Sequence, residues 1–437
     1  MTLKINNFSV AAALILLLSF GCYCDQDQSP SFTGEQIMPG ITYSCTREFS
    51  GTGPLQIHIL KIYLNNEKVN VKPCLAKGVI GNLERTSSIA LRNNAIAAVN
   101  GSFFETRNKM HLPVGFMIIN GQVVNKSILQ RTAIGITKDK KIVFGIPKIK
   151  GYAINLNNRK SVVIWGVNRP RKQNEAVIYT REYGESTGTD PSGIELAVKS
   201  DGTIRKVCPG NSYIPRDGFV LSLQGWPADF ALKTKDTDKV ELVYGLSEKW
   251  KDVEQAITGG PLLVKDGEIT HESIVAENFN SKLLAPTSRT AIGVSKDNEL
   301  IFVVADGKQS SGYVTGATFD EMAAIMKEAG AVGAIGLDGG HTSTMYVNGK
   351  VVNDPLMKYE GRVSNAVVVT YDGWETPIAL RPQASEYVYA PPDEEMVEAL
   401  KSDADLAPST YVPRPEDFGM YGIDDVYNRM IRPFIPR

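Results

Sequence analysis

Residues 318–353 read TFDEMAAIMKEAGAVGAIGLDGGHTSTMYVNGKVVN, and this stretch decides the fold class. Its first part predicts a helix, because Thr318 and Glu321 have the spacing of a capping box. Gly330 marks the end of that helix, since glycine readily adopts the left-handed conformation that closes many helices. The apolar stripe of the helix consists of Met322, Ile325, Met326 and Ala329.

The second part of the stretch predicts a buried strand, a glycine turn and a hairpin. The strand covers 334–337, the turn is Asp338-Gly339-Gly340, and Asn348-Gly349 has the composition of a tight hairpin turn. The same order occurs earlier, with a helix at 86–94, a strand at 95–99, a glycine turn at 100–102 and a hairpin turn at 120–121. This repetition predicts an internally duplicated unit of helix, strand, glycine loop and hairpin.

A second repeated pattern follows the hairpins. Arg131-Thr132-Ala133-Ile134-Gly135 follows the first one, and Arg289-Thr290-Ala291-Ile292-Gly293 follows a third hairpin at Asp266-Gly267. A degenerate copy occurs at 362–366. From 57 to 370, short apolar runs of strand length are separated by Gly, Asn and Asp turns. The predicted fold class is therefore α/β in the mixed α+β sense, with a sheet-rich single core domain built from duplicated units.

Composition and charge disfavour several classes of protein. The chain has 437 residues, of which 43% are hydrophobic and 22% charged, as in an ordinary globular protein. The formal net charge is -1 and the sequence has no long run of Lys and Arg, so no nucleic acid partner is expected. The four histidines lack metal-ligand spacing, and the sequence has no P-loop or nucleophile-elbow motif. We therefore predict neither a metal nor another cofactor.

The N-terminal residues are typical of an export signal. Lys4 supplies a positive charge, and the apolar stretch 8–20 is too short to span a bilayer, so residues 1–21 are interpreted as a signal peptide. Cys22 resembles the acylated cysteine of bacterial lipoproteins, and ordinary cleavage after Gly21 is the alternative. These features predict an exported protein of the bacterial cell envelope, either periplasmic or attached to the membrane through a lipidated Cys22.

Shifts in composition divide the rest of the chain into three parts. Residues 22–39 are interpreted as an exported linker and 40–374 as the core domain. Residues 375–437 form a proline-rich C-terminal extension with one candidate helix at 393–401. The residues that could carry chemistry lie in the core domain.

Glycine turns and carboxylates form the candidate site. The turns at 100–102, 258–261 and 338–340 follow strands directly, where backbone N–H groups could bind an anion. Arginine recognises phosphate, hydroxyl and amide groups bind sugar oxygens, and a carboxylate can act at an anomeric carbon. This inventory favours an anionic, hydroxylated substrate. The candidate carboxylates are Glu105, Asp306 and Asp338.

Each candidate residue also has a purely structural interpretation. Arg131 and Arg289 begin strands and could pair with surface carboxylates. Asp306 could belong to another turn, and Glu105 could be a solvated loop residue. Asp338 lies between a buried strand and two glycines, and its structural alternative is to cap the turn that follows.

At these residues the sequence resembles the phosphodiester glycosidase family, the domain found in the lysosomal uncovering enzyme that removes N-acetylglucosamine from phosphomannose. The resemblance extends from about Gly40 to Thr370. Any one matching segment would be a weak signal, whereas six in the same order are specific. The segments are Val99-Asn100-Gly101-Ser102-Phe103-Phe104, Asn168-Arg169-Pro170, Thr258-Gly259-Gly260-Pro261-Leu262-Leu263, Arg289-Thr290-Ala291-Ile292-Gly293, Asp306-Gly307, and Leu337-Asp338-Gly339-Gly340 through Thr344.

The resemblance implies a hydrolase that cleaves a sugar-1-phosphodiester. We expect Asp338 to be the catalytic carboxylate, with Asp306 or Glu105 as its partner. The phosphodiester is expected to bind Arg289 and the backbone N–H groups of Gly259, Gly260, Gly339 and Gly340. The residues expected to position the sugar are Asn100, Ser343 and Thr344. The other residues predicted to bind substrate are Gly101, Thr258 and Arg362.

Two positions depart from the family pattern, Lys308 after the Asp-Gly pair and His341 after the double glycine. Lys308 keeps the charge of the usual arginine without its planar fork, and His341 adds a titratable group beside the loop. These departures bear on the preferred substrate more than on the reaction class. The alternatives to an enzyme are a non-catalytic glycan-binding lipoprotein and a factor for envelope-polysaccharide assembly.

Overall fold

The computed structural model describes residues 34–105, 110–277, 279, 281–307, 314–356 and 358–377. The predicted signal peptide, Cys22, Lys308 and nearly all of the C-terminal extension lie outside the described residues. Within the described ranges, no helix combines the length and the apolar character needed to cross a membrane. Strands dominate and helices are few, so the sheet-rich, mixed α+β single domain expected from the sequence is confirmed.

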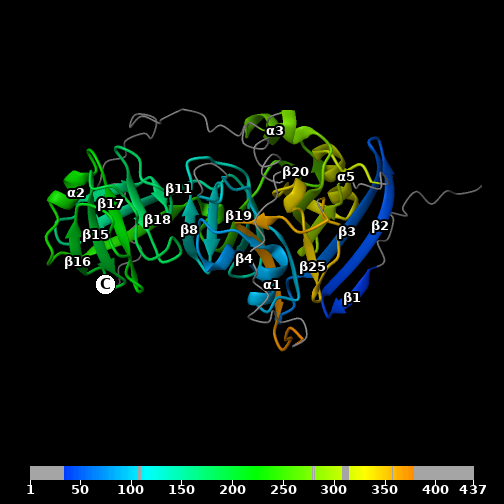
Figure 1. Ribbon diagram of the computed structural model, residues 1–437, viewed down its shortest axis with the longest axis horizontal. Helices are drawn as coiled ribbons and strands as arrows, with labels where there is room; N and C mark the ends of the chain where they lie inside the picture. The colour runs from blue at the N-terminus through cyan, green and yellow to red at the C-terminus, as the bar shows by residue number, and fades with distance from the viewer. Residues whose placement is uncertain are drawn as a thin grey trace, which may run out of the picture. The chain divides into compact units, whose positions relative to one another are not determined.

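An eight-stranded antiparallel sheet carries the strand that leads into Asp338. Its strands in order are β1 (Glu35–Met38), β2 (Ile41–Ser50), β3 (Gly53–Tyr63), β23 (Glu299–Ala305), β22 (Arg289–Ser295), β24 (Ala331–Gly336), β20 (Leu262–Lys265) and β21 (Glu268–Ile269). Helix α5 (Phe319–Glu328) packs on one face of this sheet (Figure 1). Thr318 and Glu321 form the capping box predicted for it. Strand β1 lies inside the segment 22–39, so the sheet begins before the predicted start of the core domain.

A five-stranded sheet packs against the other face. Its strands in order are β26 (Lys350–Val351), β25 (Met345–Val347), β6 (Ala97–Asn100), β28 (Asn365–Tyr371) and β4 (Val69–Leu75). Side chains alternate along each strand, so Val99 and Val367 face the core shared with the eight-stranded sheet. Ala98 and Val368 face helix α1 (Thr86–Arg92) on the outside. The result is four layers, in the order α5, eight-stranded sheet, five-stranded sheet and α1.

A ten-stranded sheet continues from this layered region. Its strands in order are β10 (Ile142–Gly145), β9 (Ala133–Thr137), β19 (Val253–Thr258), β7 (Phe116–Ile119), β8 (Gln122–Lys126), β13 (Gly166–Val167), β14 (Ala176–Tyr179), β17 (Gly218–Leu223), β15 (Ile194–Lys199) and β16 (Ile204–Cys208). Only β13 and β14 pair in parallel. Its first strands add Ile134 and Ile257 to the shared core.

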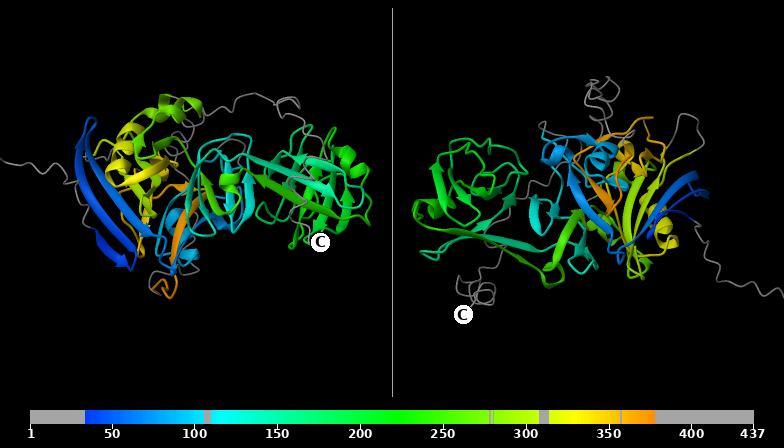
Figure 2. Two further views of the ribbon diagram at one scale, coloured as in Figure 1. Left: turned by 180° about the vertical axis from the view of Figure 1, so that it is seen from behind. Right: turned by 90° about the horizontal axis from the view of Figure 1, so that it is seen from below.

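The far strands of the ten-stranded sheet have a core of their own. They pack with a three-stranded sheet and with helix α2, which are drawn in green in Figure 2. These elements are β12 (Ser161–Ile164), β11 (Ile149–Asn155), β18 (Val240–Leu246) and α2 (Ala228–Leu232). The remaining short elements are the 3-10 turns η1 (Ala76–Gly78), η3 (Glu248–Trp250) and η4 (Gly340–Thr342), strands β5 (Glu84–Arg85) and β27 (Arg362–Val363), and helices α3 (Glu272–Ala276) and α4 (Ser281–Leu284).

The hairpin turns and the helix at 86–94 are confirmed. Asn120, Asp266 and Asn348 have φ angles of 51°, 52° and 46°, which a tight hairpin turn requires. The internal duplication stays a prediction. Hairpin β7–β8 belongs to the ten-stranded sheet, whereas hairpin β25–β26 joins β6, the strand of the other proposed copy. The linear order of elements recurs, but the strands of the two copies pair differently.

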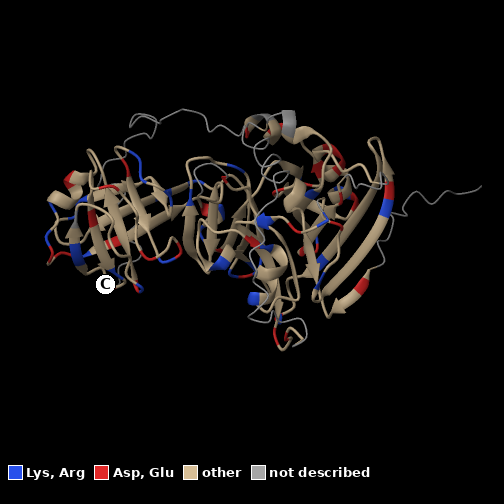
Figure 3. Ribbon diagram, viewed as in Figure 1, with Lys and Arg blue, Asp and Glu red and all other residues tan. Residues whose placement is uncertain are grey.

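Charged residues of both signs are interspersed along the described strands and loops (Figure 3). This distribution accompanies a formal net charge of -1. A buried charge interacts far more strongly with its neighbours than a charge that faces water. The few buried charged groups are therefore the ones that can define a candidate site.

Candidate active site

Asp338 lies where strand β24 ends and the 3-10 turn η4 begins. One carboxylate oxygen accepts the N–H of Gly339 at 3.0 Å, and the other accepts the hydroxyl of Thr342 at 3.0 Å. The backbone N–H of Asp338 donates to the carbonyl of Gly101 at 3.1 Å. The loop is half-buried. Asp338 therefore caps its own turn, as the structural interpretation of the sequence expects, and it also holds a carboxylate at a strand end near the surface.

Asn100 fixes this loop from the neighbouring sheet. Its side-chain amide donates to the carbonyl of Asp338 at 2.7 Å, and its side-chain oxygen accepts Thr290 Oγ1 at 2.7 Å and Thr344 N–H at 3.1 Å. The residue is completely buried. The prediction that Asn100 positions the sugar is therefore corrected, because both ends of its amide are already bonded to protein. Asn100 positions the loop that carries Asp338.

Arg131 is the cation at this site whose donors are not all engaged. Its side chain is only 4% exposed, and neither Nε nor Nη1 has a hydrogen-bond partner among the described residues. The guanidinium carbon lies 4.2 Å from the ring centre of Phe279 and 5.1 Å from that of Phe103. Burial lowers the pKa of Arg131, and the charges of Glu277 and Asp338 oppose that shift. Arg131 is therefore a buried cation rather than the surface ion-pair partner considered from the sequence.

Arg289 occupies the equivalent position in the other sheet and is braced through its Nε and Nη2. Its Nε donates to the carbonyl of Ala317 at 3.0 Å, and Nη2 donates to those of Leu283 and Ala285, both at 2.6 Å. Its guanidinium carbon lies 4.0 Å from the ring centre of Phe319. Burial lowers the pKa of Arg289 to about 10, opposed by the charge of Asp338. The role predicted for Arg289 as the phosphate ligand stays a prediction, and its Nε and Nη2 are engaged with backbone carbonyls.

Glu277 is the buried carboxylate that the sequence reasoning missed. It is 3% exposed, one oxygen accepts the hydroxyl of Thr132, and the other, Oε2, has no partner within the described part of the chain. Burial raises the pKa of Glu277, while the hydrogen bonds from Thr132 and the charge of Arg131 act in the opposite direction. Thr132 lies 145 residues away in the chain. A local pattern could not find this pair, and the one available signal was the polar Thr132 beside Arg131.

The glycine N–H groups predicted to bind the phosphodiester are already bonded to protein. Gly259 donates to the carbonyl of Thr132 and Gly260 to that of Gly336, both at 2.9 Å. In the Asp338 loop, Gly339 donates to the Asp338 carboxylate and Gly340 donates to the carbonyl of Ser288 at 2.8 Å. The anion nest expected at these four glycines is therefore corrected.

Close packing of protein against protein explains why two of these loops contain glycine. A Cβ at Gly259 would lie 2.2 Å from the carbonyl oxygen of Gly336. One at Gly101 would lie 1.9 Å from the side-chain oxygen of Asn365. Any side chain at either position would push the loops apart, so these glycines serve the fold.

The two residues predicted as catalytic partners of Asp338, Asp306 and Glu105, differ in burial and in their contacts. Asp306 is 1% exposed and bonds the ring of His58 at 3.2 Å, the amide of Asn353 at 3.2 Å and the N–H of Asp354. Burial would lower the pKa of His58, but its hydrogen bonds, first that with Asp306, raise it to about 9. Asp306 is thus committed to a buried ion pair. Glu105 is exposed.

The other predicted substrate-binding residues divide into buried and exposed groups. Thr258 is buried and exchanges hydrogen bonds with the backbone of Phe116, so it braces β7. Ser343 and Thr344 are completely buried; Thr344 Oγ1 donates to the carbonyl of Thr342, and Ser343 Oγ has no partner within the described chain. Arg362 is exposed on β27. Ser343 is the buried member of this group with an unpaired polar atom in the described chain.

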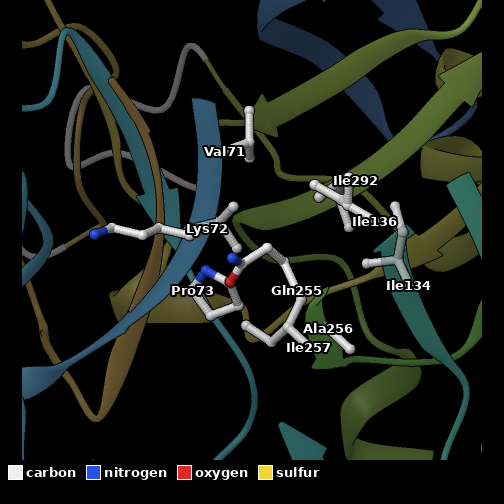
Figure 4. Close-up of a pocket in the computed structure, with 10 residues that line it drawn as sticks. Val71, Lys72, Pro73, Ile134, Ile136, Gln255, Ala256, Ile257 and Ile292 are labelled. Atoms are coloured by element: carbon white, nitrogen blue, oxygen red, sulfur yellow. The ribbon is translucent and has the colours of Figure 1, made fainter. Parts of the chain in front are cut away.

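One small cavity lies in the core shared by the sheets. Figure 4 shows a cavity of about 10 Å³ between β4, β9 and β19, lined mainly by apolar side chains such as Val71, Ile134 and Ile257. That volume is about the space of one water molecule, too small for a sugar. Among the described residues, no group of three or more His, Cys, Asp and Glu could hold a metal ion.

The fold and this cluster define a sheet-rich protein in which a buried arginine faces two carboxylates, Asp338 and Glu277, at a strand end. Residues 192–370 match the model of the family described as phosphodiester glycosidase, so the family predicted from the sequence is confirmed for this segment. Members of that family are hydrolases. The match includes Glu277, Arg289 and Asp338, whereas Asn100 and Arg131 precede it.

Similar proteins support the same family and fold. A mouse N-acetylglucosamine-1-phosphodiester alpha-N-acetylglucosaminidase is 30% identical over 110 residues, which are 23% of this chain and about a fifth (21%) of the mouse protein. A hypothetical protein from Synechocystis has a TM-score of 0.66 at 21% identity, covering 76% of this chain and 62% of its own. A putative exported protein from Burkholderia pseudomallei K96243 has a TM-score of 0.61 at 21% identity, covering 72% and 74%. At that identity the two structures establish the fold alone.

Proposed function

We propose that this chain hydrolyses a glycosyl phosphodiester, releasing a sugar and a phosphate monoester. One observation carries the proposal: the guanidinium of Arg131 is buried beside Asp338 and Glu277, yet its Nε and Nη1 have no partner among the described residues. Leaving buried charged donors unpaired costs free energy, on the order of 1–3 kcal/mol or more per group. Such a cost is typical of functional sites, where a ligand supplies the missing acceptors. An anionic phosphate oxygen is the acceptor that suits arginine.

Three further unpaired buried atoms support a polar ligand near the same loop. Glu277 Oε2, Ser288 Oγ and Ser343 Oγ all lack partners within the described residues. Ser288 also accepts the N–H of Gly340 through its carbonyl, and Ser343 donates its N–H to the carbonyl of Gly340. A sugar offers many hydroxyl groups that can bond to such atoms. Two of these residues, Ser288 and Ser343, are thus bonded through their backbones to the turn that follows Asp338.

The proposed reaction divides labour between the two carboxylates. Asp338 acts at the anomeric carbon, and Glu277 replaces Asp306 and Glu105 as its acid/base partner, because burial raises its pKa and brings protonation closer to neutral pH. A water oxygen bonds to the anomeric carbon while a carboxylate accepts the water proton. The bond from that carbon to the phosphate oxygen breaks, and its electron pair leaves with the phosphate. Arg131 stabilises the charge that develops on the leaving phosphate.

The compartment of this activity is also a proposal. The apolar N-terminal stretch and Cys22 motivate export to the bacterial cell envelope, with attachment through a lipidated cysteine as one route. Both features lie outside the described residues. The proposed substrate is a glycan or small glycoside of the envelope or the surroundings that carries a sugar-1-phosphodiester.

The test of this function uses purified protein with a panel of sugar-1-phosphodiesters that differ in sugar and anomer. Asp338→Asn is expected to lower kcat/KM by about a thousandfold, because the carboxylate is lost while the amide preserves the size of the side chain. Asp297→Asn is the matched control, since Asp297 is an exposed aspartate in a turn. Wild-type turnover retained in Asp338→Asn removes Asp338 from the mechanism. Saturable sugar binding without any product from wild type identifies a glycan-binding protein instead.

A further inference from the structure

We infer that a separate pocket beside the Asp338 loop binds an acidic group carried by the alcohol side of the substrate. The pocket has a volume of about 350 Å³, within the range of small-molecule sites. It is lined by Arg85, Val351, Asn353, Pro355, Lys358, Tyr359 and Glu360. This inference rests on the proposed function, and it adds the chemical class of the leaving alcohol.

The pocket wall is bonded to the loop that carries Asp338. Gly361 follows the lining residue Glu360, and its N–H donates to the carbonyl of His341 at 3.1 Å. A Cβ at Gly361 would lie 2.4 Å from that oxygen, so the two backbones are in close contact. The lining residue Asn353 donates to the carbonyl of Ser343 at 3.2 Å. His341 and Ser343 both follow Asp338 within five residues of sequence, so the pocket adjoins the reacting end of the substrate.

The charged side chains that line this pocket favour an acidic ligand. Arg85 and Lys358 bring two exposed cations to its wall. The pocket also has one carboxylate, that of Glu360. Both of its oxygens accept hydrogen bonds from Ser87, one from the backbone N–H at 3.0 Å and one from the hydroxyl. Arg362 lies opposite Arg85 in the β27–β5 ladder and adds positive charge nearby. Ser87 orients the Glu360 carboxylate but leaves its charge, so the two lining cations exceed the single lining carboxylate and the pocket is net positive.

The backbone at Lys358 and the ring of Tyr359 complete the argument. Lys358 has φ of 64°, a left-handed conformation that a lysine rarely adopts, and its N–H donates to the carbonyl of Pro355 at 2.8 Å. Tyr359 follows this tight turn and is 38% exposed. An aromatic ring with an exposed face can stack on a sugar-like ring. The pocket thus fits a carboxylate or phosphate attached to a compact alcohol.

The experiment compares two phosphate monoesters that are products of the proposed reaction. Propyl phosphate carries a neutral alcohol, and 2-carboxyethyl phosphate carries an acidic one of similar size. We expect wild type to bind 2-carboxyethyl phosphate about tenfold more tightly in calorimetry, since a charge-assisted hydrogen bond contributes about that factor. The double variant Arg85→Gln/Lys358→Asn is expected to lose this preference and to disfavour the acidic monoester, because Glu360 stays charged. Asparagine is chosen at 358 because it tolerates the left-handed conformation.

The matched control is Arg159→Asn. Arg159 is also exposed and also has positive φ, 60°, but it lies in the hairpin between β11 and β12. It is expected to keep the tenfold preference. Equal binding of the two monoesters by wild type overturns the inference, and so does a preference that survives in the double variant. Absence of turnover together with a preserved preference contradicts the proposed function while leaving the acidic subsite intact.

Discussion

Two stretches of this chain share five identical residues and have different roles. Arg131-Thr132-Ala133-Ile134-Gly135 leads into β9, and Arg289-Thr290-Ala291-Ile292-Gly293 forms most of β22. Both arginines are buried, both guanidinium groups lie over a phenylalanine ring, and both feel the charge of Asp338. The rings of Phe279 and Phe319 contact each other edge to face, with their centres 5.7 Å apart.

The difference lies in what surrounds each copy. Arg289 donates to three backbone carbonyls, whereas Arg131 has two donors without partners in the described chain. Thr290 donates to Asn100, which braces the Asp338 loop, whereas Thr132 donates to the buried carboxylate of Glu277. One copy therefore builds the scaffold and the other is available to a ligand. The identical local sequence does not determine the role of each arginine, because the groups that accept its hydrogen bonds come from distant segments.

The largest expected effect is the loss of activity in Arg131→Met. Methionine can fill the space between Phe103 and Phe279 but cannot bind phosphate. We expect kcat/KM for the best substrate of the panel to fall by about a hundredfold to a thousandfold. The unfolding midpoint in urea is expected to be unchanged or higher, because burial of the Arg131 charge costs more than the neighbouring carboxylates return. Full activity in a folded variant would show that the two copies do not differ in function.

The reciprocal substitution, Arg289→Met, is expected to act mainly on stability. It leaves the carbonyls of Leu283, Ala285 and Ala317 without their donor. We expect the free energy of unfolding to fall by about 2–4 kcal/mol, measured by urea denaturation. Arg205→Met, on β16, is the control for loss of an arginine elsewhere. A stable Arg289→Met protein would contradict the scaffold role.

The smallest expected effect is a change in how the free energy of unfolding depends on pH. It tests Glu277, the carboxylate beside Arg131. Burial raises the pKa of Glu277 above the ordinary value of 4.5. A raised folded-state pKa means that the carboxyl contributes stability below about pH 4.5, and that this contribution is lost as pH rises through the raised pKa. Glu277→Gln is therefore expected to gain stability relative to wild type as pH rises through that window, followed by urea midpoints.

Glu272→Gln is the matched control for the pH series, since Glu272 belongs to α3 just before Glu277 and its side chain is 82% exposed. The control is expected to follow wild type at every pH. A difference between Glu277→Gln and wild type that does not change with pH would show that Glu277 keeps an ordinary pKa. The carboxylate would then be a poor candidate for the acid/base partner of Asp338.

The features that the sequence predicted well are set by neighbours in the chain. The capping box of Thr318 and Glu321 and the hairpin turns at Asn120 and Asn348 follow from hydrogen bonds and φ preferences within a few residues. The strand before Asp338 follows from a short apolar run. The role of Asn100 could not be predicted, because its hydrogen-bond partners lie in other segments.

The sequence by itself therefore determined the fold class, the family and the position of Asp338 at a strand end. Only the tertiary structure decided that Arg131 keeps free donors, that Asp306 is bound to His58, and that Glu277 stands near the site. The physical reason is that burial and hydrogen-bond satisfaction depend on which distant groups meet. Thr132 and Glu277 are 145 residues apart, and their contact arises only when the sheets pack.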